Sequence, residues 1–275
     1  MTNQTPLRVR IRTLLKALLP KTIFRFVSSV WRKTGAGFFD VQGIVERYTA
    51  DFIAHNPKIV QAGPFVGMNY VDSAVGSNYI HKLIGSYEAV LHPVIKSLQN
   101  SDFNTVLDIG SAEGYYLIGL GRMFPQAHLI GFELEDVGRS LTKEMYQKNN
   151  LYNQLDLQEE ATASNIGQFI TSQTLLICDC EGAELDILDI EKCPALSIVK
   201  SAIIELHDDF RPGIKQTLTN RFSKTHTISI IKFQMAEPDE YPYLARIKDK
   251  SQQYELLRER GIQDQEWMIL EKITF

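Results

Sequence analysis

From residue 104 onward, short apolar runs alternate with segments of helical periodicity, and this alternation limits the fold more than any other feature of the chain. The first run, "TVLDIG", is bounded by turn residues and is typical of a strand buried on both faces. Four more strands are predicted by "HLIGFEL", "LDLQEEA", "TLLICDC" and "SAIIELHD", with helical patterns between them. Strands that alternate with helices form right-handed βαβ units and a parallel sheet covered on both faces. The sequence therefore predicts an α/β, doubly wound fold.

The end of the chain departs from this rhythm. The segments "HTISIIKFQM", 226–235, and "WMILEKITF", 267–275, both read as strands. An insertion at about 236–266, charged and helical in part, separates them in place of an ordinary crossover helix. We therefore expect a seven-stranded, mostly parallel sheet with an antiparallel C-terminal edge strand.

The part of the chain before residue 104 is predicted to be a helical extension. Apolar residues at helical spacing predict a helix over 41–55 and one further helix over 79–98. Between them, 56–78 is rich in Gly, Pro and Asn and is typical of a loop. These patterns divide the chain into a basic amphipathic arm (1–40), a helical lead-in or cap (41–100) and a sheet domain (101–275).

Positive charge is concentrated at the N-terminus. Residues 1–39 hold eight basic residues and no acidic one, although the whole chain has a net charge of −4. No apolar stretch there approaches the roughly 20 residues of a membrane span, and no small-residue cleavage site of a signal peptide follows one. Two interpretations remain: an amphipathic helix packed on its own domain, or peripheral contact of residues 8–33 with an anionic membrane or an acidic partner.

The cysteine content favours a reducing, cytoplasmic setting. Cys178, Cys180 and Cys193 are too few and too oddly spaced for a disulfide framework or for a four-ligand zinc site. The hydrophobic fraction of 44% and the charged fraction of 23% are those of a globular protein.

Acidic residues or a histidine end four of the predicted strands. In open α/β sheets, ligands bind beyond the carboxyl ends of the strands, so these side chains are expected to meet at one edge. They are Asp108, Glu133, Asp179, and Glu205 with His207. Four convergent strand ends predict a ligand site.

The turn D-x-G-S-x-x-G, 108–114, is suited to a ligand that carries an amino acid and a nucleoside. Gly110 and Gly114 permit close approach of the backbone, and the N–H groups that open the next helix favour a carboxylate. Asp108 favours an ammonium group, and Glu133, 25 residues later, is placed to accept both hydroxyls of a ribose. The G-x-G-x-x-G fingerprint of a nicotinamide-dependent oxidoreductase, a rival interpretation, is absent.

Several ordered motifs resemble the FkbM-like family of S-adenosylmethionine-dependent methyltransferases. "LLICDCEGAELDIL" and "AIIELHD" are similar to its D-x-E-G-A-E and E-x-H elements, and "VLDIGSAEGYY" and "LIGFELED" are similar to its first two motifs. The resemblance covers roughly 104–210 and implies a Rossmann-like class I methyltransferase sheet. It also implies S-adenosyl-L-methionine over the first two strands and an acceptor over the fourth and fifth. Cys180, where an aliphatic residue is more usual, and Glu160, where glycine is common, depart from the family pattern.

The turn and the resemblance together give a set of candidate site residues. The cofactor-binding candidates are Asp108, Gly110, Ser111, Gly114, Tyr115, Glu133, Ala161 and Asp179. The catalytic candidates are His207, Asp179, Glu181 and Glu205. His207 is the first choice for the base that deprotonates a hydroxyl, because its unperturbed pKa lies near neutrality. The alternative is a structural histidine that ties the fifth strand to a neighbour.

The expected activity is O-methylation of a hydroxyl on a sugar, a glycan or another small-molecule metabolite, with no nucleic-acid partner. One alternative is a non-catalytic scaffold of the same fold that docks through the basic arm. The other is a metal-assisted O-methyltransferase, with Mg²⁺ held by Asp179, Glu205, His207 and Asp208. No ligand spacing enforces that site, so the sequence predicts no metal.

Overall fold

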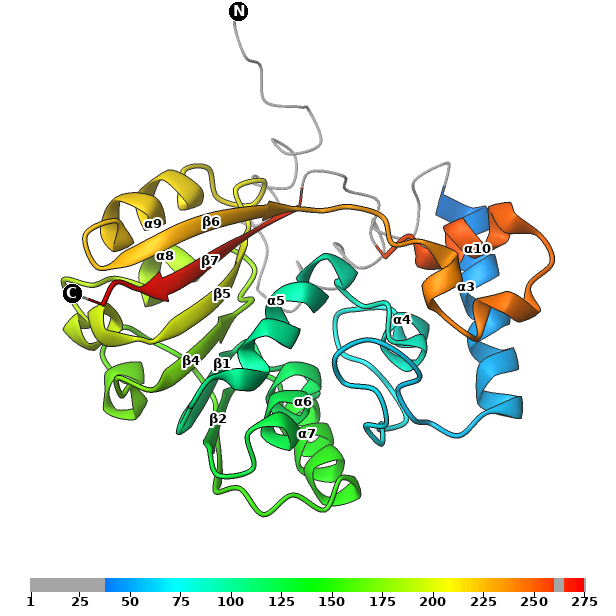
Figure 1. Cartoon of the computed structure of the whole chain (residues 1–275), viewed down its shortest axis with the longest axis horizontal. Helices are drawn as coiled ribbons and strands as arrows, with labels where there is room; N and C mark the ends of the chain where they lie inside the picture. The colour runs from blue at the N-terminus through cyan, green and yellow to red at the C-terminus, as the bar shows by residue number, and fades with distance from the viewer. Residues whose placement is uncertain (1–37, 260–264, 275) are drawn as a thin grey trace, which may run out of the picture.

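A computed structural model describes residues 38–259 and 265–274 (Figure 1). Almost all of the predicted basic arm, 1–40, lies outside the described residues. The same holds for segment 8–33, for which membrane contact was one interpretation. Within the described part of the chain, no helix combines the length and the apolar character that crossing a bilayer requires.

A seven-stranded sheet forms the centre of the molecule, in the order β3-β2-β1-β4-β5-β7-β6. Strands β1 to β5 run parallel, whereas β7 is antiparallel to both of its neighbours. This topology confirms the predicted doubly wound, mostly parallel seven-stranded sheet, and it places the antiparallel C-terminal strand between β5 and the outermost strand β6. The strands are β1 (Thr105–Ile109), β2 (His128–Phe132), β3 (Leu155–Gln158), β4 (Thr174–Cys178), β5 (Ser201–Leu206), β6 (His226–Lys232) and β7 (Glu266–Lys272).

Two layers cover the sheet, one on each face. In β1, Val106 packs into the layer that holds α6 and Leu107 into the layer that holds α9. Strands β1, β4 and β5 are buried along their whole length, which is why most of their residues are apolar. The first layer contains α5 (His92–Ser97), α6 (Tyr115–Met123) and α7 (Asp136–Lys148), and the second contains α8 (Glu184–Ile187) and α9 (Ile214–Phe222).

The lead-in and the insertion pack together, and we call residues 43–100 with 236–259 the cap. Figure 1 shows α3 (Phe38–His55) against α10 (Lys250–Leu257), on the side of the view opposite to β6 and its neighbouring helix α9. Phe52, Leu256 and Trp267 belong to one buried cluster, so the cap shares its core with the sheet. The Tyr243 hydroxyl, from the insertion, donates a hydrogen bond to Asp51 Oδ2 at 2.8 Å in α3.

The single helix predicted over 79–98 is wrong. Helix α4 (Tyr79–Ile84) ends where Gly85 adopts a φ of 83°, and the chain resumes as a 3₁₀ turn, Ala89–Leu91, before α5. A Cβ on Gly85 would lie 2.1 Å from the carbonyl oxygen of Ala62. The loop 56–78 therefore packs against Gly85 through Ala62, and this contact between the two segments ends the helix.

Candidate functional site

The turn after β1 packs directly on the end of β4. Gly110 has a φ of 85°, and a Cβ there would lie 1.8 Å from the carbonyl oxygen of Asp179. The N–H groups of Gly110 and Ser111 both donate to the carbonyl oxygen of Phe132, at 2.8 and 3.0 Å. Gly114, with a φ of 90°, is the cap residue immediately before α6. The two glycines are thus required by the backbone, and the turn brings the ends of β1, β2 and β4 to one place.

Two buried polar atoms in this turn have no hydrogen-bond partner. They are Oδ2 of Asp108, whose residue is 3% exposed, and Oγ of Ser111. Burial, followed by the nearby carboxyl group of Asp179, raises the pKa of Asp108 to about 8. A cationic group, such as a ligand ammonium, would satisfy Asp108 and restore its charge.

Glu133 lies just beyond β2, as predicted, and already holds the loops around it. Its carboxylate accepts hydrogen bonds from the backbone N–H of Ala112 at 3.0 Å and of Glu135 at 2.7 Å. These two hydrogen bonds fix the carboxylate just beyond the end of β2, the position from which the sequence predicts a ribose-binding role.

The side chains of two other predicted cofactor residues pack into the core layers. The ring of Tyr115 is buried, with edge contacts to Phe65 and Tyr87 at centroid distances of 5.2 and 5.3 Å. Its side chain is therefore part of the core beneath the cap, and only its backbone begins the helix at the site. Ala161 is partly buried after β3 and packs against the second core layer.

His207 lies at the centre of a carboxyl cluster at the ends of β4 and β5. Its Nδ1 is 2.6 Å from Oε1 of Glu184, and its Nε2 is 3.5 Å from Asp179 Oδ1 and 3.5 Å from Glu205 Oε1. Burial alone would lower the pKa of His207, but the hydrogen bond to Glu184 and the charges of Glu205 and Asp179 raise it to about 10. The imidazole is then protonated near neutrality, so this arrangement does not favour His207 as a base that starts out neutral.

The structure separates two acidic residues from this cluster. Glu181 is exposed on the turn after β4, with a φ of 55°, and Glu184 from the same D-x-E-G-A-E motif contacts His207 instead. Asp208 accepts hydrogen bonds from the N–H groups of Gly213 and Lys215, at 3.0 and 2.9 Å, and so holds the start of α9. Of the four metal ligands weighed from the sequence, three come together and Asp208 does not.

Glu113 is a buried residue that the sequence analysis missed. It is fully buried and accepts hydrogen bonds from Lys82 Nζ at 2.5 Å, from the Tyr70 hydroxyl at 2.5 Å and from the N–H of Val75 at 2.9 Å. Burial opposes its ionisation, but Lys82 and the other donors lower its pKa below the ordinary value. The network ties the cap to the cofactor turn. Its only sequence signal is an acid within "DIGSAEG".

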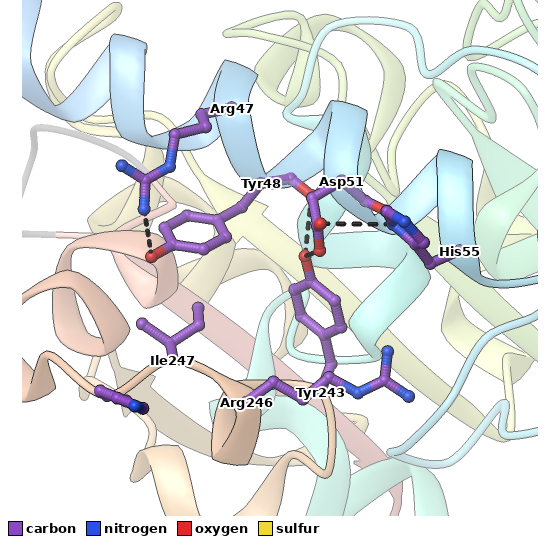
Figure 2. Close-up of a pocket in the computed structure, with 8 residues that line it drawn as sticks. Arg47, Tyr48, Asp51, His55, Tyr243, Arg246 and Ile247 are labelled. Atoms are coloured by element: carbon purple, nitrogen blue, oxygen red, sulfur yellow. Dashed lines mark hydrogen bonds and ion pairs between the residues drawn. The ribbon is translucent and has the colours of Figure 1, made fainter.

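A separate cleft of about 610 Å³ lies within the cap, between α3 and the insertion (Figure 2). Arg47 and Asp51 of α3 face Tyr243 and Arg246 across it. None of the predicted site residues lines this cleft. The candidate site is therefore defined by the strand ends and not by this cleft.

No family model matches the chain, and no curated protein matches it either. Solved structures resemble it in part, among them a precorrin-6y C5,15-methyltransferase from Geobacter metallireducens, 9% identical over 74% of this chain and 93% of that one, with a TM-score of 0.47. An rRNA methylase from Streptococcus thermophilus is 11% identical over 67% and 96%, with a TM-score of 0.46. The O-methyltransferase TomG from Streptomyces achromogenes, solved in complex with SAM, is 12% identical over 69% and 80%, with a TM-score of 0.44. At this level of likeness, a function for this chain has to be argued from its own site.

Proposed function

We propose that this protein is an S-adenosyl-L-methionine-dependent O-methyltransferase that acts on a hydroxyl of a sugar, a glycan or another small-molecule metabolite. The observation that carries the proposal is the convergence of Asp108, Glu133, Asp179 and Glu205 at the carboxyl ends of four neighbouring strands. The FkbM-like resemblance supports the sugar or glycan class.

The cofactor turn fits the two polar ends of S-adenosylmethionine. The unpartnered Oδ2 of Asp108 would accept a hydrogen bond from the ammonium group, and Ser111 Oγ and the N–H groups at the start of α6 would donate to the carboxylate. The carboxylate of Glu133, held at the end of β2 by the N–H groups of Ala112 and Glu135, would accept hydrogen bonds from the ribose hydroxyls.

Bound S-adenosylmethionine supplies a methyl carbon on a positively charged sulfur. That methyl group would pass to the acceptor oxygen as the carbon–sulfur bond breaks, and the electron pair of the broken bond would stay on the sulfur, which becomes a neutral thioether. The hydroxyl proton passes to a base on the protein. Asp179 is placed for this role because its side chain is 31% exposed, whereas Glu205 and His207 are 3% and 4% exposed behind it.

Calorimetry with S-adenosylhomocysteine tests the cofactor site. We expect the wild-type chain to bind this product, NADH to bind far more weakly, and Glu133→Gln to weaken product binding roughly tenfold or more through loss of a charged acceptor. Glu144→Gln is a matched control, because Glu144 pairs with Lys148 on the surface of α7. A wild-type chain that bound NADH and ignored S-adenosylhomocysteine would contradict the proposal.

Methyl transfer from labelled S-adenosylmethionine to a panel of hydroxylated acceptors tests the reaction. Asp179→Asn is expected to lower turnover roughly 100-fold or more if Asp179 takes the proton. If this variant kept its turnover, a group other than Asp179 would have to accept the hydroxyl proton. Product binding without turnover on any acceptor would instead favour the scaffold alternative.

A further inference from the structure

Three ligand atoms from the ends of β4 and β5 share one small space. One atom from each of Asp179, Glu205 and His207 lies within 4.8 Å of the other two. His207 Nε2 is 3.5 Å from a carboxylate oxygen on either side. Atoms bound to a single divalent ion are spaced roughly 3 Å apart in an octahedral shell, so small side-chain movements would bring these three into one coordination sphere.

The imidazole of His207 is oriented as metal-binding imidazoles are. Its Nδ1 is hydrogen-bonded to Glu184, which is fully buried, and this contact fixes the orientation of the imidazole ring. Its Nε2 is buried and has no hydrogen-bond partner, although it is directed between two carboxyl groups. A histidine that is held by a carboxylate through one nitrogen and presents the other to a metal is a recurrent arrangement in metal sites.

The balance of groups in this region also favours a cation. Asp179, Glu184 and Glu205 bring three carboxyl groups together around one imidazole, which supplies at most one compensating positive charge. The buried basic side chain of the cap, Lys82, is committed to Glu113. Buried carboxyl groups require compensating charge, and a divalent ion would provide it.

We propose that Asp179 Oδ1, Glu205 Oε1 and His207 Nε2 bind a divalent cation, with Glu184 as the positioning residue for His207. Two carboxylates with one imidazole favour Mn²⁺ over Mg²⁺, which prefers oxygen ligands alone. The open side of the site faces Asp179, the most exposed of the three ligands. Resting on the proposed function, the ion would bind the acceptor hydroxyl and ease loss of its proton to the other oxygen of Asp179.

The test is Mn²⁺ binding to the full chain after treatment with EDTA, followed by electron paramagnetic resonance and calorimetry. We expect one Mn²⁺ per chain in the wild type and loss of that binding in Asp179→Asn. Glu184→Gln should weaken the affinity roughly 10- to 100-fold, as expected for the support of a ligating histidine. Asp209→Asn, an exposed acid two residues from His207, is the matched control and should bind as the wild type does.

The outcomes separate this inference from the proposed function. A wild-type chain that binds S-adenosylhomocysteine but not Mn²⁺ at millimolar concentration would overturn the cation site alone. Mn²⁺ binding that is equal in the wild type, Asp179→Asn and Glu184→Gln would overturn it as well. Mn²⁺ binding without product binding would instead remove the methyltransferase proposal and leave the cation site standing. Circular dichroism of each variant confirms that the comparison is made on folded protein.

Discussion

Asp108 combines deep burial with a carboxylate oxygen that has no partner. The pKa of its carboxyl group rises to about 8 in the folded chain, from an ordinary value of 3.8. The folded state therefore resists ionisation that the unfolded state permits. The stability associated with this group is fully present below pH 3.8 and is lost progressively as the pH rises toward 8.

Replacement of Asp108 by Asn is expected to raise the stability of the cofactor-free chain at pH 8 and to flatten its decline between pH 4 and 8. In the wild type, each pH unit of increase within that window lowers the free energy of unfolding by roughly 1.4 kcal/mol. The same change should weaken S-adenosylhomocysteine binding roughly tenfold or more, because the charged partner of its ammonium is gone. Urea unfolding across pH and calorimetry measure the two effects. Equal pH dependence in Asp108→Asn and the wild type would show that this carboxyl group does not set it.

At the residue scale, the sequence predicted which side chains reach the strand ends but not which of them touch. Asp108, Glu133, Asp179 and His207 were found because each follows an apolar run. Glu184 was quoted within a motif, but its contact with His207 spans 23 positions of the chain and depends on the register of β4 and β5. The hydrogen bond to Glu184 and the charges of Glu205 and Asp179, which raise the pKa of His207 against the effect of burial, have no local signature in the sequence.

At the element scale, buried strands were predictable because a parallel strand covered on both faces is continuously apolar. The break in the predicted helix 79–98 was not, because it depends on contact with another segment. Residues 82–95 keep an apolar helical spacing, yet the chain leaves the helix at Gly85 because Ala62 lies against it. The spacing of apolar residues predicts which side chains are buried. It does not predict where the backbone of another segment ends a helix.

Gly85→Ala is therefore expected to lower the free energy of unfolding. The left-handed conformation alone costs a non-glycine residue about 1 to 2 kcal/mol, and the new Cβ would also meet the Ala62 carbonyl. Gly43→Ala in α3 is the matched control, because no atom lies within 4 Å of its added Cβ and helix propensity favours alanine by roughly 1 kcal/mol. Urea unfolding should move the two variants in opposite directions. A stable Gly85→Ala would mean that the backbone at this position is free to rearrange.

At the scale of the whole molecule, the two halves of the cap meet through a histidine that has to stay neutral. His81 of α4 is completely buried, and its Nε2 is 2.5 Å from the carbonyl oxygen of Leu256 in α10. Its Nδ1 has no hydrogen-bond partner, so a proton there would be buried without an acceptor. Burial accordingly lowers the pKa of His81 to about 4, and burial lowers that of His92 to about 4 as well.

This lowered pKa makes the contact between α4 of the lead-in and α10 of the insertion sensitive to acid. The unfolded chain binds a proton near pH 6.5 and the folded chain only near pH 4, so the stability due to His81 is present above pH 6.5 and is lost as the pH falls toward 4. Between pH 7.5 and 5 the loss is about 2 kcal/mol for this one group. His81→Gln keeps a donor for the Leu256 carbonyl but cannot be protonated. Urea unfolding at both pH values should therefore show a loss smaller by about 2 kcal/mol in His81→Gln than in the wild type. If the two proteins lost the same stability, the acid sensitivity of the molecule would have to arise outside the contact between α4 and α10.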